Sequence, residues 1–536
     1  MEKIHRPMVM CKNGLVASGH HLASLSGVKI LIEGGNAIDA AIATSAVLCV
    51  VRPHMTGIGG DAFMLIYSAE NDELKALNAS GPAPLTATRE YFLNQGMKTI
   101  PSTGMLSVSV PGIVDSWVKA YERYGTMSLA KVLQPAIEYA ESGFPVYPRL
   151  SASITSNISK LLLYPSSAKI FLRDGRALEP GENLLQKDLA KTLKKIAQGS
   201  DFYRGEIASA IAKFSQENHG LLSEEDLERY QSRWYAPIST TYRDYKVFEQ
   251  PPVSQGHILL QELSIVEGFD LAKLGHNTAE AIHVMVEAKK LAFADRINYL
   301  SDPDFVTIPL KKLLSKEHAA KQRARINMTQ AMSKPVPHGN LKFEGDTTYF
   351  AVVDRERNAV SFIQSLFQTF GSGVVVENTG ILLNDRMTGF SLEPDHVNRL
   401  EPGKKTAHTL NNYLVFKEDR PFMLGGTPGA DDQVQINLQV IANVIDYGMF
   451  IQQAIEAPRW SSHPGTAPTE EAYPYTLWVE DRITPEVRTA LEEKGHRIKV
   501  VDGWSIGGAQ GIVIDQTRQI LMGGADPRRD GYVIGW

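Results

Sequence analysis

Gly345-Asp346-Thr347-Thr348-Tyr349-Phe350-Ala351-Val352-Val353 is the stretch around which the chain is organised. From Thr348 onward it is rich in β-branched and aromatic residues, a pattern that predicts a strand. The run 335–340 just before it contains two prolines and a glycine, and we expect an exposed loop there. We hypothesise that the chain cuts its own peptide bond between Asp346 and Thr347. Thr347 would then become a new N-terminal residue.

An N-terminal threonine carries a nucleophile and a base on the same residue. A hydroxyl reacts poorly unless a base removes its proton, and the free amine can do so. An α-amino group has an unperturbed pKa near ~8, against ~10.4 for lysine, so a useful fraction is neutral near pH 7. Taken alone, Thr347-Thr348 also fits an ordinary strand, because β-branched residues are common in strands. The rest of the chain favours a self-cleaved N-terminal threonine over an ordinary strand.

Composition and charge limit the class of protein. The chain has 536 residues, of which 43% are hydrophobic and 21% charged, values typical of a globular protein with more than one unit. A net charge of −5 gives no attraction for nucleic acid or an anionic membrane, so neither is expected as a partner. Two cysteines, Cys11 and Cys49, are too few for a disulfide framework. No secretory signal precedes the first motif, and we expect a cytoplasmic protein.

Helices and hairpins both recur along the chain. Apolar periodicity predicts helices at 20–33, 37–48, 128–141 and 278–300, the second capped by Asn36. Short charged or polar turns join pairs of predicted strands at 348–353 with 359–366, 413–416 with 422–425, and 511–514 with 520–522. Hairpins combined with long helices indicate a layered α+β domain and not a doubly wound parallel sheet.

Three glycines, Gly57, Gly59 and Gly60, precede a predicted strand at 62–67. A dinucleotide-binding loop would follow a strand and open a helix, so that interpretation fails on context. We interpret the segment as a tight turn with its glycines at positive φ.

Short motifs from one end of the chain to the other resemble those of the γ-glutamyltranspeptidase family: Gly34-Gly-Asn-Ala-x-Asp-Ala-Ala41, Val110-Pro-Gly-Ile-Val114, Tyr124-Gly-Thr-Met127, Gln250-Pro-Pro-x-Ser-x-Gly256, Lys290-x-Ala-x-Ala-Asp-Arg296, Ala457-Pro-Arg459 and Ala525-Asp-Pro-Arg528. The resemblance implies an α+β fold, the four-layer αββα sandwich of N-terminal-nucleophile hydrolases. Segments 1–346 and 347–536 would be large and small fragments that share one core.

The resemblance also implies roles near the nucleophile. Thr347 would attack first the carbonyl of Asp346 and afterwards the amide of a substrate. Ser365 stands where the family has a threonine that hydrogen-bonds the nucleophile, although it also fits an ordinary strand serine. Gly429-Ala430 occupies the position of two adjacent glycines whose N–H groups bind an oxyanion. A plain helix-entry turn is the alternative for this segment.

The residues expected to recognise a γ-glutamyl group depart from the family pattern. Its α-carboxylate and α-ammonium require a cation and an anion. Ser80 replaces the family's arginine, the aspartate after Met387 is absent, and three further positions are changed, to Phe367, Arg386 and the pair His408-Thr409. Arg386 could hold a carboxylate and His408 a polar acyl terminus. The alternatives are a surface cation and a satisfied loop histidine.

We therefore predict a self-processing amide hydrolase or acyltransferase that acts on a small-molecule amide through an acyl-enzyme on Thr347. The family implies γ-glutamyl compounds such as glutathione, whereas the changed pocket favours a glutaryl- or cephalosporin-type acylase. A non-catalytic relative that keeps the fold is the alternative from another class. No cofactor or metal is required, and the absence of His-Glu-x-x-His and Gly-x-Ser-x-Gly argues against a zinc or serine-triad enzyme.

Overall fold

A computed structural model describes residues 4–333, 345–464 and 475–536, and only the backbone of Gly345 and Asp346. The loop predicted at 335–340 lies outside the described residues.

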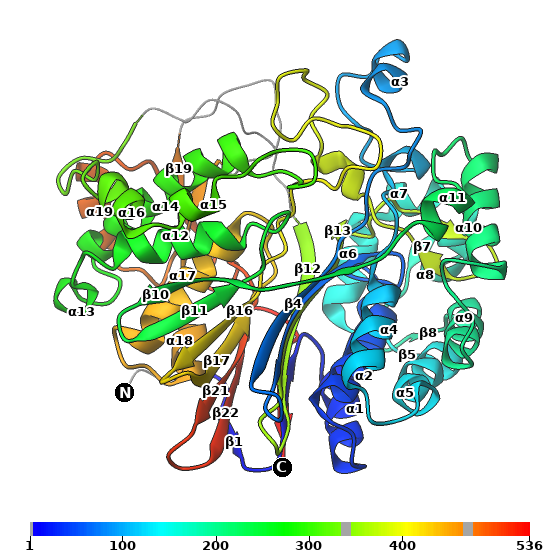
Figure 1. The fold of residues 1–536 in the computed structure, drawn as a ribbon, viewed down its shortest axis with the longest axis horizontal. Coiled ribbons are helices and arrows are strands. Elements are labelled where there is room, and N and C mark those ends of the chain that lie inside the picture. The colour runs from blue at the N-terminus through cyan, green and yellow to red at the C-terminus, as the bar shows by residue number, and fades with distance from the viewer. Residues whose placement is uncertain (1–3, 334–344, 465–474) are drawn as a thin grey trace.

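Within the described residues, two seven-stranded antiparallel sheets lie at the centre of the molecule (Figure 1). Sheet A has the order β1 (Val9–Cys11), β22 (Ile520–Ala525), β21 (Gln510–Asp515), β17 (Arg420–Gly426), β16 (Tyr413–Lys417), β11 (Tyr245–Glu249), β10 (Ile238–Tyr242). Sheet B has the order β23 (Tyr532–Gly535), β2 (Leu15–Ser18), β12 (Gly345–Val353), β13 (Ala359–Gln368), β3 (Asp61–Ser68), β4 (Glu73–Ala79), β9 (Arg233–Tyr235).

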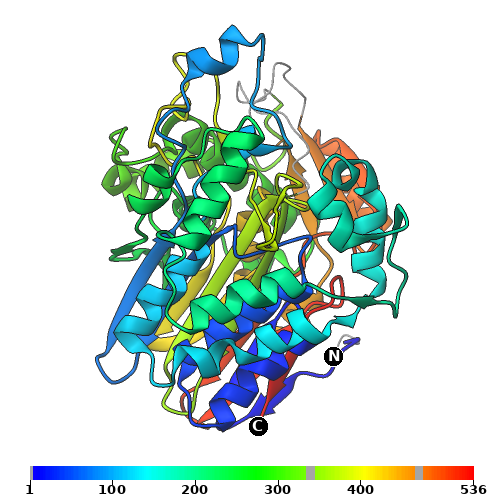
Figure 2. The same cartoon turned by 90° about the vertical axis from the view of Figure 1, so that its right-hand side faces the viewer.

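Helices cover the outer face of each sheet, as Figures 1 and 2 show. Over sheet B lie α1 (His21–Ile32), α2 (Ala37–Val51), α4 (Ile113–Tyr124) and α5 (Leu129–Ser142). Over sheet A lie α12 (Gly256–Val266), α14 (Ala279–Tyr299), α17 (Asp432–Ile445) and α18 (Ile451–Glu456). The layers follow the order helix, sheet, sheet, helix, so the predicted αββα sandwich is confirmed.

Shorter elements connect and extend these layers: α3 (Arg89–Asn94), η1 (Met105–Ser107), β5 (Phe144–Pro145), α6 (Pro148–Ser156), α7 (Ile158–Leu162), α8 (Pro165–Phe171), β6 (Leu172–Arg173), β7 (Arg176–Ala177), β8 (Asn183–Leu184), α9 (Lys187–Ala197), α10 (Glu206–Glu217), α11 (Glu224–Glu228), α13 (Leu271–Leu274), α15 (Leu310–Leu313), α16 (Lys316–Arg323), β14 (Val375–Val376), β15 (Ile381–Leu382), η2 (Arg386–Gly389), β18 (Trp460–His463), β19 (Thr476–Glu480), α19 (Pro485–Glu493) and β20 (Ile498–Val501). In the described part of the chain, no helix has both the length and the apolar character needed to cross a bilayer.

The predicted helices and hairpins are present with ends displaced by only a few residues. The four helices correspond to α1, α2, α5 and α14, and the three hairpins to β12–β13, β16–β17 and β21–β22. The side chain of Asn36 accepts hydrogen bonds from two amides at the start of α2. The Asn36 amide donates to the Asp39 carboxylate, which completes a capping box. The amide of Thr126 also donates to Asp39, so two of the sequence motifs meet there.

The glycines before β3 do not adopt the conformation that the sequence suggested. Gly57, Gly59 and Gly60 are not among the residues at positive φ, so that prediction is wrong. Glycine is needed here because other backbone segments approach closely. A Cβ on Gly59 would lie 2.3 Å from the Leu382 carbonyl oxygen. A Cβ on Gly60 would lie 2.4 Å from the Ser365 carbonyl oxygen. Any side chain here would push β13 away from the start of β3.

Alternation along β12 divides its side chains between two cores. Tyr349, Ala351 and Val353 pack between the sheets, whereas Phe350 and Val352 pack beneath the helices over sheet B. Because successive side chains of a strand point to opposite faces, Thr347 belongs to the face between the sheets and Thr348 to the face under the helices.

Segments 1–346 and 347–536 both supply strands to each sheet. β12 and β13 lie between β2 and β3 in sheet B, and β16 pairs with β11 in sheet A. A break after residue 346 would therefore leave two fragments that remain hydrogen-bonded to each other.

A buried ion network holds the ends of β19, β22 and α18 together. Asp526 accepts from Arg459 Nη1 at 2.7 Å, and Glu480 accepts from Arg528 Nε at 2.6 Å. All four side chains are buried. Burial would raise the pKa of Asp526, but Arg459 and Arg528 outweigh it and lower the pKa below its usual value. The carboxylate therefore stabilises the fold above pH ~4, and this contribution is lost as the pH falls through its depressed pKa.

We predict that Asp526→Asn lowers the free energy of unfolding by about 3–5 kcal/mol, because it leaves a buried guanidinium without its carboxylate. Denaturant unfolding followed by far-UV circular dichroism measures this loss. Asp174→Asn, at an exposed position, is the matched control and should change stability by no more than about 0.5 kcal/mol. Equal stability of the two variants would contradict a structural role for the network.

Candidate active site

Thr347 lies on β12 opposite Ser365 of β13. The Thr347 hydroxyl donates to the Ser365 hydroxyl oxygen, with 3.3 Å between the two atoms, and both side chains are buried. The Ser365 oxygen also accepts from the backbone N–H of Phe367 at 2.7 Å. The structure thus brings together three residues that the sequence singled out.

The pairing of β12 with β13 is interrupted at the peptide bond that we predict to be cut. Asp346 pairs with Phe367 and Thr347 with Ser365, so Leu366 has no residue opposite it. Such a bulge bends a strand and redirects its side chains. Phe367 has φ of 86°, a conformation that costs a bulky residue roughly 1–3 kcal/mol. The backbone opposite the junction between residues 346 and 347 is therefore strained.

Asp61 extends the row of Thr347 and Ser365 by one more strand. It is the first residue of β3 and pairs with Ser365, so the three side chains share one face of sheet B. Asp61 is fully buried. Its Oδ2 accepts from Arg386 Nε at 2.9 Å and lies 3.2 Å from His408 Nε2, and its Oδ1 accepts from the Gly81 amide at 3.2 Å.

Two predicted substrate-binding residues are thus the ion-pair and hydrogen-bond partners of Asp61. Arg386 is 1% exposed, so the alternative of a surface cation is wrong. Its guanidinium carbon lies 4.1 Å from the ring centroid of Phe367. The Leu410 amide donates to His408 Nδ1, which leaves Nε2 of His408 to donate to Asp61. Ser80 lies next to Gly81, and its amide and hydroxyl both donate to Asn78 Oδ1.

The charge state of this group follows from burial and contact. Burial lowers the pKa of His408 to about 4, and Arg386 adds to the effect. Burial alone would raise the pKa of Asp61, but the hydrogen bond from His408 and the charge of Arg386 bring it below its usual value. At neutral pH the group consists of an Asp61 carboxylate, an Arg386 guanidinium and a neutral His408. Asp385, beside Arg386, has its pKa raised by burial to about 6.

Gly429 and Ala430 form the turn between β17 and α17. Both residues lie at positive φ, 130° and 47° respectively. An alanine in the left-handed region costs about 1–2 kcal/mol. Within the described residues, the N–H group of neither residue donates to an acceptor. Two adjacent unpartnered amides suit an oxyanion.

Gln255 connects this turn to the rest of the site. Its Nε2 donates to the carbonyl oxygens of Ala430, at 3.1 Å, and of Thr409. Thr409 follows His408, which bonds to Asp61. On the other side, a Cβ on Gly426 at the end of β17 would lie 2.3 Å from the ring of Tyr349, two residues from Thr347. β17, which leads into the turn, therefore packs against β12 close to Thr347.

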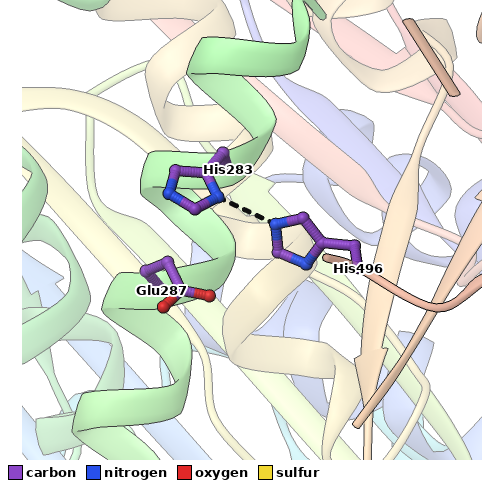
Figure 3. Close-up of side chains that lie close together, drawn as sticks. All are labelled: His283, Glu287 and His496. Atoms are coloured by element: carbon purple, nitrogen blue, oxygen red, sulfur yellow. Dashed lines mark hydrogen bonds between the residues drawn. The ribbon is translucent and has the colours of Figure 1, made fainter. Parts of the chain in front are cut away.

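One group of side chains in the described residues has the composition of a metal site (Figure 3): His283 and Glu287 of α14, with His496. Their potential ligand atoms lie within 4.8 Å of one another. His283 Nδ1 lies 2.8 Å from His496 Nε2, and His283 Nε2 lies 2.8 Å from the Asn327 carbonyl oxygen. Lys290 and the Met332 amide donate to the two oxygens of Glu287. These contacts engage both ring nitrogens of His283, both oxygens of Glu287 and Nε2 of His496 within the protein.

Sequence reasoning missed Asp61 and Gln255. Asp61 directly follows the glycines before β3, and an acid at the start of a buried strand is a signal that could have been noticed. Gln255 lies within a quoted motif, but its role depends on two segments far away in the sequence.

Known proteins match the chain over nearly its whole length. The sequence model described as gamma-glutamyltranspeptidase matches residues 23–536. The glutathione hydrolase-like YwrD proenzyme of Bacillus subtilis (strain 168) is 42% identical over 526 residues, which cover 97% of this chain and 98% of that protein. The glutathione hydrolase proenzyme of Escherichia coli (strain K12) is 37% identical over 547 residues, covering 98% and 92%. The crystal structure of cephalosporin acylase from Bacillus halodurans matches with a TM-score of 0.92 and 39% identity, covering 100% and 98%.

We predict that Ser365→Ala slows the appearance of fragments 1–346 and 347–536 by about two- to tenfold, the value of one net hydrogen bond. The variant removes the acceptor of the Thr347 hydroxyl and of the Phe367 amide. Ser365→Thr retains that acceptor and should cleave close to the wild-type rate. Denaturing electrophoresis over time measures the rates, and Ser200→Ala, at an exposed site, is the matched control. Unchanged cleavage in Ser365→Ala would show that the serine has only a strand role.

Proposed function

The chain belongs to the gamma-glutamyltranspeptidase family, and from this membership and the site geometry we propose that Thr347 is its nucleophile. It is an enzyme, an amide hydrolase or acyltransferase of the self-processing kind. The observation that carries the proposal is the buried Thr347 hydroxyl, 3.3 Å from Ser365, on the strand that follows the strained junction.

The first reaction is cleavage of the chain. The Thr347 hydroxyl oxygen attacks the carbonyl carbon of residue 346, the peptide C–N bond breaks, and the hydroxyl proton ends on the new amine. Water then hydrolyses the resulting ester, which gives a carboxylate on residue 346 and a free hydroxyl and amine on Thr347. The Ser365 hydroxyl accepts the hydrogen bond that orients the attacking oxygen. Relief of the strain opposite the junction favours the cut.

The second reaction uses the new terminus on a substrate amide. The amine takes the hydroxyl proton, and the oxygen attacks the amide carbonyl carbon. The amides of Gly429 and Ala430 stabilise the negative charge that develops on the carbonyl oxygen. The substrate's amine leaves with the proton, and the acyl group remains on Thr347 as an ester. Water or a second amine then releases it, which gives hydrolysis or transfer.

We predict that Thr347→Ala stays a single chain without amidase activity, whereas Thr347→Ser is cut because it keeps a hydroxyl. Intact mass spectrometry gives the extent of cleavage, and release of an anilide chromophore gives the activity. Thr517→Ala, in an exposed turn, should behave as the wild type. A fully active Thr347→Ala protein, or a wild type that is active while uncut, would refute the proposal. Activity in an uncut wild type would mean that a residue other than Thr347 is the nucleophile.

A specific observation favours an acylase over a γ-glutamyl enzyme within this family. An α-ammonium group needs a free carboxylate, but both oxygens of Asp61 are already engaged. Arg386 keeps one donor: its Nη2 is buried and reaches no acceptor in the described part of the chain. We therefore propose an acyl group whose far end accepts a hydrogen bond and carries no ammonium, such as glutaryl. One of the matching structures is titled as a cephalosporin acylase.

We predict that glutaryl-anilide is turned over with a kcat/KM at least about tenfold above that of γ-glutamyl-anilide. Both acyl groups end in a carboxylate, but the α-ammonium of the γ-glutamyl group would be left without an acceptor, which costs about 1–3 kcal/mol. Arg386→Gln should lower both values, because both acyl groups end in a carboxylate that Arg386 would bind. Arg229→Gln, at an exposed position, is the control for loss of an arginine. A wild type that prefers γ-glutamyl-anilide would contradict the acylase assignment and leave the Thr347 mechanism intact.

A further inference from the structure

Arg52 is a buried cation to which the described residues offer no carboxylate. It follows α2 and is 1% exposed. Its Nη1 donates to Thr348 Oγ1 at 3.3 Å, whereas its Nε and Nη2 reach no acceptor in the described part of the chain. An arginine cannot escape burial by losing its proton. A buried charge is tolerated only when it is paired, so these two N–H groups require a partner.

The unpartnered edge of Arg52 has the geometry of a binding site. Nε and Nη2 lie on the same side of the planar guanidinium, so their N–H bonds run parallel and together form the edge that makes bidentate contacts with anions. Two residues further on, His54 is also buried, and neither of its ring nitrogens has a partner among the described residues. A neutral imidazole supplies one further N–H donor.

Aromatic and imidazole rings enclose this group. The centroid of Tyr147 lies 4.9 Å from that of His20 and 6.3 Å from that of His54. The Tyr147 hydroxyl donates to the Val51 carbonyl. Burial and the charge of Arg52 hold the pKa of His54 well below its usual value. The His54 ring is therefore neutral, and Arg52 is the cation that an anion would neutralise.

The remaining charges around His54 do not neutralise Arg52. Arg149 and Arg529 both lie close enough to His54 to lower its pKa further. The carboxylate of this neighbourhood, Asp530, pairs with Arg149 through Oδ2 and Nε at 3.4 Å. Arg149 Nη2 also donates to the Arg528 carbonyl oxygen. Asp530 therefore forms an ion pair with Arg149, although Nε and Oδ2 make no hydrogen bond, and it forms no ion pair with Arg52 among the described residues.

We propose that Arg52 and His54 bind a small inorganic anion of the halide type behind Thr348. A single spherical acceptor can contact the Nε and Nη2 donors together, and one negative charge balances the one positive charge of Arg52. Ordered water would satisfy the hydrogen bonds and leave the charge uncompensated. The site lies on the helix-facing side of β12, whereas Thr347 faces the space between the sheets. It is therefore separate from the acyl site.

Diffraction from crystals grown in sodium bromide tests the proposal directly. We expect an anomalous bromide peak in contact with Nε and Nη2 of Arg52. A map with water alone at this position, or no peak, would overturn the proposal. The diffraction result does not depend on enzyme activity, so it tests the anion site independently of the proposed reaction.

Thermal unfolding gives the corresponding test in solution. With chloride replacing gluconate at constant ionic strength, each tenfold increase above the dissociation constant should raise the melting temperature by about 1–2 °C. Arg52→Gln should abolish this dependence, and Arg355→Gln, at an exposed arginine, should retain it. The same chloride response in wild type and Arg52→Gln would refute the site. Should Arg52→Gln fail to fold, the bromide map of the wild type decides.

Discussion

Antiparallel pairing across β12, β13 and β3 sets the positions of Thr347, Ser365 and Asp61 in one row on the inner face of sheet B. Residues opposite each other on neighbouring strands lie about 5 Å apart and share a face, so the row follows from the register alone. A slip of one residue would turn all three side chains toward the helices. The close approach of Gly60 to the Ser365 carbonyl holds this register at the start of β3.

The bulge at Leu366 adds strain at one end of that row. It brings Phe367 to positive φ and directs the Phe367 amide to the Ser365 oxygen. The same ring lies against the Arg386 guanidinium. A single irregularity therefore connects the proposed cleavage junction with Ser365 and with Arg386, the partner and the cation of the proposed site. An unbroken ladder would have separated these functions.

Charges in the pocket are paired within the protein before any substrate arrives. Asp61 neutralises Arg386 and accepts a hydrogen bond from His408, so the Asp61 carboxylate is not free for a substrate ammonium, whereas Nη2 of Arg386 has no acceptor among the described residues. A buried carboxylate with an ion pair and hydrogen bonds costs far less than an isolated one. This pairing is compatible with a changed set of substrate-recognition residues, because it leaves the strand β12 in place. On the other face of β12, Thr348 contacts a second cation, Arg52, that has no such partner in the described residues.

Local patterns in the sequence determined the helices and the hairpins, because capping, periodicity and turn chemistry act within a few residues. Asn36 and the strand from Thr348 are examples. The motifs also indicated the four layers, and they point to Thr347, Gly429 and Ala430 as the residues that we propose for catalysis. Only the tertiary structure decided what the polar pocket residues do. Arg386 is buried and not a surface cation because Asp61, 325 residues away in the sequence, reaches its Nε. Pairing across such a separation depends on register and burial, and no local pattern encodes either.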